Sequence, residues 1–249
     1  MKKLYICFLI FIINLMAFGT NFSVAPTRFE LKIDKISTNE VFVTNNTKKP
    51  LRIETHIEND KDFGEEFNLS SNITIFPKVV TIKPAGKQVI RFRVKPGVDL
   101  KNGEYKSYIV FKEIPLEIKN TGEKNSNGST STNLTILTEL GISVYGISGE
   151  EVLKGKIENF KLDYKDKALC IKFDSISTGN TSFKYKYKIE DEKGKILSAG
   201  RAGNSLRNGK TNIVFCLTKT ENLRGKNIKV KLLDQSDRVL AEKTAKIAF

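Results

Sequence analysis

Apolar and polar residues alternate along most of this chain with a period of two. The alternation is clear in residues 29–33, 51–58 and 90–94, and it returns in residues 183–190 and 228–232. This period puts apolar side chains on one face of a strand, whereas a helix needs a period near 3.6. Short runs rich in Asn, Gly and Pro separate the segments, as turns do. The pattern predicts an all-β protein built from β-sandwiches.

Polar segments divide the chain into parts. Residues 120–133 carry no apolar side chain, which predicts a mobile loop within the first part. Residues 149–151 read Gly-Glu-Glu and indicate a hinge. We therefore expect an N-terminal domain over residues 20–147 and a C-terminal domain over residues 150–249. Both have the strand spacing of an immunoglobulin-like β-sandwich.

The first 19 residues, 1–19, have the features of a cleaved secretory signal. Lys2 and Lys3 precede an apolar run at 4–13, and small residues stand before a cleavage point after residue 19. The alternative is a retained membrane anchor. We favour cleavage, because the run is shorter than the roughly 20 apolar residues of a spanning helix and Asn14 interrupts it. The sequence then predicts a soluble protein in an exported compartment, with no integral membrane segment.

Basic residues outnumber acidic ones, with 42 Lys and Arg against 28 Asp and Glu and a formal charge of +14. Basic patches interleaved with aromatic side chains are typical of nucleic-acid surfaces. In residues 183–190, however, lysines and aromatics fall on opposite faces of the predicted strand. The aromatics then belong to the core, and solvated lysines protect the strand from aggregation. We expect no nucleic-acid partner, but some attraction to acidic partners.

The chain contains one histidine, His56, on the polar face of the predicted strand at 51–58. A zinc site closed by His and Cys needs about four ligands, and His-dependent nucleophilic catalysis would need this residue. No partner cluster lies near it in sequence, and the acidic pairs at 65–66 and 150–151 fall in a turn and a hinge. We therefore predict no catalytic residue, no metal site and no cofactor.

Two cysteines, Cys170 and Cys216, belong to the second domain. Each is out of phase with its apolar neighbours, which puts it on the less apolar face of its strand. If the two strands are neighbours, the cysteines can form a cross-strand disulfide in an oxidising compartment. Sequence does not fix the register, so a disulfide and two free thiols both remain open.

Several motifs of the first domain follow one another in the order and spacing of a known family. They are Val24-Ala-Pro-Thr-Arg-Phe29, Val41-Phe-Val-Thr-Asn-Asn46, Lys49-Pro50-Leu51, Ile75-Phe76-Pro77 followed by the turn at 81–86, and the segment Tyr105 to Pro115. On these motifs the chain resembles the periplasmic pilus-assembly chaperones of the chaperone-usher pathway. The linker and the second domain match this family only in strand pattern and length.

The resemblance implies two immunoglobulin-like domains set as an L. It also implies a non-enzymatic periplasmic chaperone that stabilises pilin or fimbrial subunits by lending them a strand, which completes the subunit's own sandwich. The subunits are then delivered to an outer-membrane usher, without nucleotide, and the chaperone is monomeric when no client is bound. The alternative is an exported two-sandwich structural or adhesin-like surface protein, which would polymerise or attach to the cell surface.

The resemblance gives the strand after the polar loop a role in subunit binding. One face of this strand carries Leu134, Ile136, Thr138, Leu140 and Ile142. In the family, bulky apolar residues of this strand enter the incomplete subunit. Unpaired backbone groups beside apolar side chains form a template for another chain. The alternation also fits a strand that merely closes its own core, and both hold if only the N-terminal half stays available.

Arg28 matches the family's cleft arginine, which binds the carboxylate at the C-terminus of the subunit. A guanidinium suits this role because it donates two parallel hydrogen bonds and stays charged. The family's second basic residue, on the last strand of the first domain, is missing, since residues 125–153 contain no Lys or Arg and Glu139 stands near its place. Either Arg28 works alone, or a basic residue from another strand, such as Lys112, substitutes.

Overall fold

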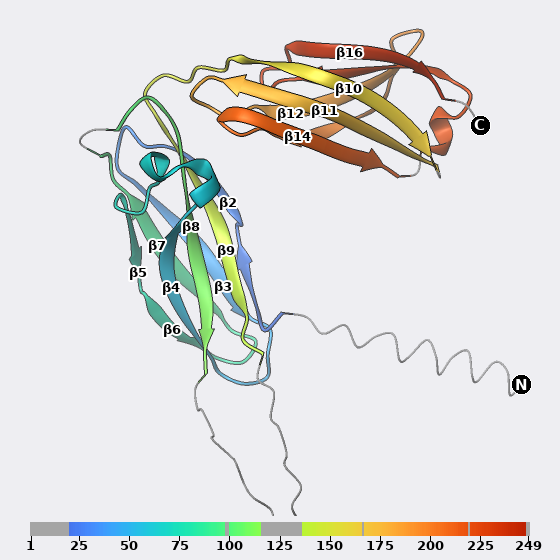
Figure 1. Cartoon of the computed structure of the whole chain (residues 1–249). Coiled ribbons are helices and arrows are strands. Elements are labelled where there is room, and N and C mark those ends of the chain that lie inside the picture. The colour runs from blue at the N-terminus through green and yellow to red at the C-terminus, as the bar shows by residue number, and fades with distance from the viewer. Residues whose placement is uncertain (1–19, 98–99, 116–135, 166, 219, 248–249) are drawn as a thin grey trace, which may run out of the picture.

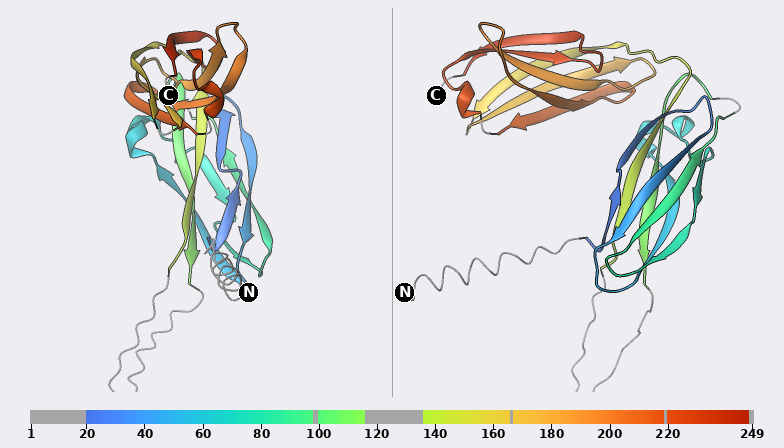
Figure 2. Two further views of the ribbon diagram at one scale, coloured as in Figure 1. Left: turned by 90° about the vertical axis from the view of Figure 1, so that its right-hand side faces the viewer. Right: turned by 180° about the vertical axis from the view of Figure 1, so that it is seen from behind.

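The computed structural model describes residues 20–97, 100–115, 136–165, 167–218 and 220–247. Strands make up most of it, and the described residues contain no α-helix. Figures 1 and 2 show two β-sandwiches joined at one end, with their long axes at a steep angle, so that the molecule is L-shaped. The predicted all-β fold of two sandwiches is confirmed. The expected signal and the expected loop at 120–133 lie outside the described residues.

Nine strands form the first sandwich. They are β1 (Phe22–Ala25), β2 (Arg28–Lys32), β3 (Ser37–Asn45), β4 (Leu51–Asn59), β5 (Ile73–Phe76), β6 (Val79–Ile82), β7 (Lys87–Val94), β8 (Gly103–Ile114) and β9 (Glu139–Ser148). One sheet has the order β1-β3-β7-β5 and the other β2-β9-β8-β4-β6. The pair of β2 and β9 is parallel. Pro26 stands between β1 and β2, where the chain changes sheets; proline cannot donate to a ladder and suits such a break.

The first core lies between these two sheets and is formed by alternate residues of each strand. Ile53, Phe92, Phe111 and Val144 are fully buried there. Burying one such side chain contributes about 1.5–3 kcal/mol. In β2 it is Phe29 that packs inward, with its ring edge on Phe92 at a centroid distance of 4.9 Å. Because neighbouring residues of a strand face opposite sides, the residues on either side of Phe29 project from the outer face of the sheet.

Seven strands form the second sandwich. They are β10 (Gly155–Lys165), β11 (Ala168–Thr178), β12 (Lys184–Asp191), β13 (Ile196–Asn204), β14 (Asn208–Leu217), β15 (Asn227–Leu233) and β16 (Val239–Lys246). The sheet orders are β10-β11-β14 and β13-β12-β15-β16. Aromatic residues of β11 and β12 fill the core, as their parity predicts, with the Phe173 and Tyr185 rings edge to face at 5.1 Å. The lysines that alternate with them project outward.

Cys170 and Cys216 are directly opposite each other on β11 and β14. They are joined by a disulfide, with a Cα–Cα distance of 4.0 Å. Both lie on the outer face of their sheet, because Leu169 and Ile171, on either side of Cys170, are fully buried. This is the face that their phase relative to their apolar neighbours predicts.

Residues 149–154 connect the sandwiches, and the start of β8 contacts the second sandwich directly. The Glu104 amide donates to the Asn180 carbonyl at 2.8 Å, and the buried Glu104 carboxylate accepts from the Ser182 amide at 2.9 Å. Gly103 has φ +138°, and a Cβ there would lie 2.8 Å from the Asn180 carbonyl oxygen. Only glycine allows this close approach.

A second contact between the sandwiches uses two short 3₁₀ turns that follow β4. They are η1 (Lys61–Phe63) and η2 (Glu65–Phe67); a third turn, η3 (Glu221–Leu223), belongs to the second sandwich. The Arg207 guanidinium of the second sandwich lies over the Phe67 ring at 3.3 Å. This stacking holds a charged group against an aromatic surface where the two sandwiches meet. None of the helices in the described ranges is long and apolar enough to cross a membrane.

Candidate functional site: the β9 edge and the Arg28 cluster

The N-terminal half of β9 has a strand on one side only. From Glu139 to Ser148 it pairs antiparallel with β8, but β2 covers its other side only from Ser143 to Ile147. At the start of that covered part, the Ser143 amide donates to the Thr27 carbonyl at 3.1 Å. Backbone groups alternate in direction along a strand, so those of Glu139 and Gly141 also point to this side. Within the described chain no strand pairs with them there.

The predicted apolar face of this strand changes its environment along its length. Ile142 is 1% exposed within the core, Leu140 is half-buried against it, and Ile136 is 74% exposed. Thr138 lies between them and is half-buried, whereas Leu134 falls outside the described residues. The C-terminal part therefore closes its own sandwich, while the N-terminal part offers an apolar side chain and a free edge.

Glu113 fixes the backbone where this free segment begins. Its amide donates to the Thr138 carbonyl at 3.0 Å, and its carboxylate accepts from the Thr138 amide at 3.1 Å. The same carboxylate accepts from the Asn21 side chain at 2.8 Å. Through Glu113, the pairing of β8 continues to Thr138, one residue before β9 begins. The same side chain links this point to Asn21, directly before β1. The sequence motif from Tyr105 to Pro115 includes Glu113, but it did not predict this role.

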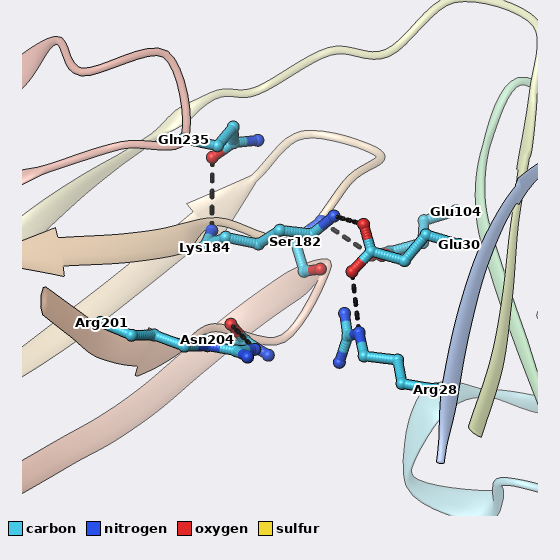
Figure 3. Close-up of polar contacts among 8 residues, drawn as sticks. All are labelled: Arg28, Glu30, Glu104, Ser182, Lys184, Arg201, Asn204 and Gln235. Atoms are coloured by element: carbon cyan, nitrogen blue, oxygen red, sulfur yellow. Dashed lines mark hydrogen bonds and ion pairs between the residues drawn. The ribbon is translucent and has the colours of Figure 1, made fainter. Parts of the chain in front are cut away.

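Arg28 projects from the outer face of β2 toward the second sandwich. Its Nε donates to Glu30 Oε1 at 2.7 Å, and its guanidinium lies over the Tyr145 ring of β9 at 3.9 Å. Figure 3 shows Glu30 between Arg28 and Lys184, which comes from β12 of the second sandwich and bonds the other Glu30 oxygen. Burial alone would raise the pKa of Glu30, but hydrogen bonds from Lys184 and Arg28 outweigh it and hold that pKa below its usual value.

One donor of this guanidinium, Nη2, lacks a partner within the described part of the chain. It is buried and makes no hydrogen bond there. Leaving a buried donor unpaired costs about 1–3 kcal/mol, and more for a charged group. Nε and Nη2 form the same edge of the guanidinium fork, which can donate two parallel bonds to one carboxylate. Glu30 fills half of that edge.

The structure does not bring Lys112 to Arg28. Lys112 faces Glu139 across β8 and β9, with 3.7 Å between its Nζ and Glu139 Oε2. Arg28 is level with Ser143 and, across β9, with Tyr108. Lys112 is therefore four residues further along β8, about 13 Å at the usual strand rise. This register puts Lys112 away from Arg28, and the residue beside Arg28 on β9 is Ser143. A role for Lys112 in subunit binding stays a prediction.

Another basic residue of the first sandwich, Lys106, contacts the same aromatic ring as Arg28. Its Nζ lies 5.3 Å from the centroid of the Tyr145 ring, the ring on which Arg28 also stacks. Lys106 is bonded to the Asp60 carboxylate and to the Tyr108 hydroxyl. Burial would raise the pKa of Asp60 and lower that of Lys106, but these contacts reverse both shifts. Both groups stay charged near neutral pH.

Sequence reasoning missed Glu30, Lys106, Tyr145 and Lys184. Strand parity puts the first three on the outer face of their sheet, which is a usable signal for exposure. It does not say which outer residues become neighbours, because that depends on the parallel pairing of β2 with β9. Lys184 belongs to the other sandwich, and only the packing of the two sandwiches brings it to Glu30.

The Arg28 cluster is made of ion pairs and a cation–π contact. His56 lies on the outer face of β4, with its Nε2 2.9 Å from Glu58 Oε1. Over the described ranges no group of three or more His, Cys, Asp and Glu side chains is placed to hold a metal ion. Within the described residues, the site combines a strand edge that no other strand covers with the Arg28 guanidinium, whose buried Nη2 has no partner.

Comparison with known proteins gives matches to structures and to one family. No curated protein matches the sequence. Similar solved structures include the E. coli chaperone DraB, with 10% identity over 92% of this chain and 97% of that chain (TM-score 0.49). The Pseudomonas aeruginosa CupB2 chaperone has 9% identity over 90% of this chain and 100% of that chain (TM-score 0.47). The Salmonella enterica SafA pilin complex with the SafB chaperone has 11% identity over 93% and 98% (TM-score 0.45).

Residues 21–142 match the family described as pili and flagellar-assembly chaperone, PapD N-terminal domain. The match runs from the start of β1 into β9, and so includes Arg28, Glu113 and the free part of β9. It covers the motifs on which the sequence resembles these chaperones. The chain therefore belongs to the family of pilus-assembly chaperones, with residues 21–142 as its PapD N-terminal domain.

Proposed function

We propose that this protein is a periplasmic, non-enzymatic chaperone that holds incomplete pilus or fimbrial subunits by adding a strand to them, and then delivers them to an outer-membrane usher. The observation that carries the proposal is the one-sided pairing of β9 before Ser143, together with the exposed Ile136. Membership of the chaperone family supports it. No cofactor is required, because the chemistry is hydrogen bonding and apolar burial.

Strand addition gives the free edge a physical role. The backbone groups of Glu139 and Gly141 would hydrogen-bond a client strand laid beside β9, which supplies affinity with little dependence on client sequence. The exposed Ile136 side chain would enter the gap in the client's sandwich, and the alternation of the sequence predicts the same role for Leu134. Each apolar side chain that is fully buried in this way adds about 1.5–3 kcal/mol to the complex.

Arg28 would anchor the client's terminal carboxylate and so set the register of the added strand. The unpaired Nη2 donor supports this role, because a carboxylate bound side-on would satisfy it together with Nε. Stacking on Tyr145 keeps the guanidinium plane in place. Replacing Arg28 with Ala should lower the yield of client complex without unfolding the chaperone, since the side chain is partly exposed and its ion pair lies at the surface.

The test is a tagged pull-down from the periplasm, with mass spectrometry of co-purifying chains. Wild type should recover a small β-rich exported subunit, and Ile136→Asp should lose it. The matched control is Val214→Asp, which puts the same charge on an exposed apolar position of β14 in the second sandwich and should bind as wild type does. Equal recovery with Ile136→Asp would overturn strand addition at β9.

A further inference from the structure

The Glu30 carboxylate divides its two oxygens between the two sandwiches. Oε1 accepts from Arg28 Nε at 2.7 Å, and Oε2 contacts Lys184 Nζ. As a result Glu30 binds one donor of the Arg28 side-on edge and leaves the other, Nη2, buried without a partner among the described residues. A carboxylate free to use both oxygens would satisfy both donors. The client-free protein therefore holds its anion site half-filled by one of its own side chains (Figure 3).

We propose that Glu30 is an internal competitor for the carboxylate site at Arg28, and that Lys184 of the second sandwich limits how strongly it competes. The proposal rests on the proposed carboxylate-binding function of Arg28. An incoming carboxylate displaces Glu30 from Nε and takes Nε and Nη2 together. Glu30 keeps Lys184 as its partner, so the displaced charge is not left alone. Lys184 thereby connects the occupancy of the Arg28 site with a contact between the sandwiches.

The position of the charges supports this arrangement. Arg28, Glu30 and Lys184 side chains are 27%, 44% and 32% exposed, so the ion pairs are partly screened and can be exchanged. Lys106, which also faces the Tyr145 ring, is bonded to Asp60 and Tyr108 and does not compete for Glu30. Glu30 is thus the competitor in this arrangement, and Lys184 is its counter-ion.

Substitutions at the two ends of the Glu30–Lys184 contact should change carboxylate binding in opposite directions. This distinguishes competition by Glu30 from a purely structural contact. Glu30→Gln removes the competing charge and should strengthen carboxylate binding at Arg28. Lys184→Met frees Glu30 Oε2 to bind Nη2 as well, so it should weaken carboxylate binding. If Glu30 only joined the sandwiches, both substitutions would break the same contact and would change binding in the same direction.

The experiment is an acetate titration of the ¹⁵N-labelled full protein, followed by the Arg28 Nε–H signal, with chloride at equal ionic strength as reference. We expect apparent acetate affinity at least threefold tighter in Glu30→Gln and at least threefold weaker in Lys184→Met than in wild type. Glu190→Gln and Lys186→Met are matched controls on β12, because each changes the charge equally but belongs to a pair within the second sandwich. These controls should stay within twofold of wild type.

Shifts in the same direction for both variants, or shifts no larger than the controls, would overturn the proposal. The titration contains no client, so its result is independent of the pull-down. If acetate affinity shifts in opposite directions in the two variants, but Ile136→Asp still captures client as wild type does, the internal competitor is supported and strand addition is contradicted. If neither variant changes acetate affinity, but Ile136→Asp loses client capture, the internal competitor is contradicted and strand addition is supported.

Discussion

The free part of β9 and the outer strand β10 of the second sandwich are both sheet edges, but their compositions are opposite. Residues 136–142, before the part of β9 that β2 covers, contain one charged side chain, Glu139, and it is paired with Lys112. β10 contains five charged residues in eleven, three of them lysines. Charged residues, and lysine above all, discourage a second chain from pairing with an edge. The first sandwich lacks this protection at the position where a client strand is proposed to bind.

A second contrast lies along the segment that runs into β9. Ile136, three residues before β9, and Ile142 within it have the same parity, yet one is 74% exposed and the other 1%. The transition follows β2, which covers β9 from Ser143 onward. One strand can therefore complete its own core and still present an edge. Two properties, stability and client capture, should then respond to different residues of this strand.

The largest expected effect is on the buried half of β9. Ile142→Ala should lower the free energy of unfolding by about 2–5 kcal/mol, because it removes packed methyl groups and leaves a cavity. Ile136→Ala should stay within about 0.5 kcal/mol of wild type, as exposed substitutions do. Urea unfolding followed by circular dichroism measures both. Similar losses for the two variants would contradict the division of β9.

A somewhat smaller effect is expected from the disulfide of the second sandwich. Replacing Cys170 and Cys216 with Ser together should destabilise this sandwich by about 2–4 kcal/mol, since the bridge closes a long loop in the unfolded chain. The bridge joins β11 and β14 of the second sandwich, whereas the proposed client edge belongs to β9, so client capture per folded molecule should not change. Thermal unfolding and the pull-down, run on the same preparations, compare the two properties. A loss of capture without unfolding would show that the second sandwich takes part in binding the client strand.

The smallest effect is a pH dependence of the second sandwich. Hydrogen bonds from Asn159, Asn212 and Lys210 hold the pKa of Asp174 below its ordinary value of 3.8. A carboxyl with a lowered pKa in the folded state stabilises the fold above its unfolded pKa, and this contribution is lost as pH falls toward the folded pKa. The stability difference between wild type and Asp174→Asn should therefore shrink below about pH 4.

Urea titrations at pH 6, 4 and 3 test this expectation, with Asp163→Asn as the control. Asp163 lies in β10, with its carboxylate 4.0 Å from Lys172 Nζ and 60% of its side chain exposed. It should show little change across the series, since exposed pairs contribute little. A constant difference between wild type and Asp174→Asn would contradict the assigned hydrogen bonds.

The strands and their inner faces could be predicted from the sequence, because a period of two is local information. The assignment of Ile53, Phe92 and Tyr185 to buried faces needed nothing from the rest of the chain. The phase of Cys170 and Cys216 could also be predicted, but not their pairing. Their contact depends on β11 and β14 being neighbours, and the order of strands in a sheet is not encoded in local alternation.

The Arg28 cluster could be predicted only in part. A motif identified Arg28 itself, but its neighbours come from β8, β9 and β12, which are distant in sequence. The separation of Lys112 from Arg28 could not be predicted, because β8 carries more than one outward basic residue and only the register decides which of them lies near Arg28. Glu30 and Lys184 meet through the packing of two sandwiches, which no pattern within either sandwich reports.

Amide hydrogen exchange along β9 tests the central claim most directly. In the free protein, amides of Glu139 and Gly141 should exchange fast, because they face the open side, while those of Leu140 and Ile142 should be protected by β8. With the subunit recovered in the pull-down, Glu139 and Gly141 should become protected, and amides of the outer strand β10 should not change. Unchanged exchange of Glu139 and Gly141 in a stable complex would contradict strand addition at β9.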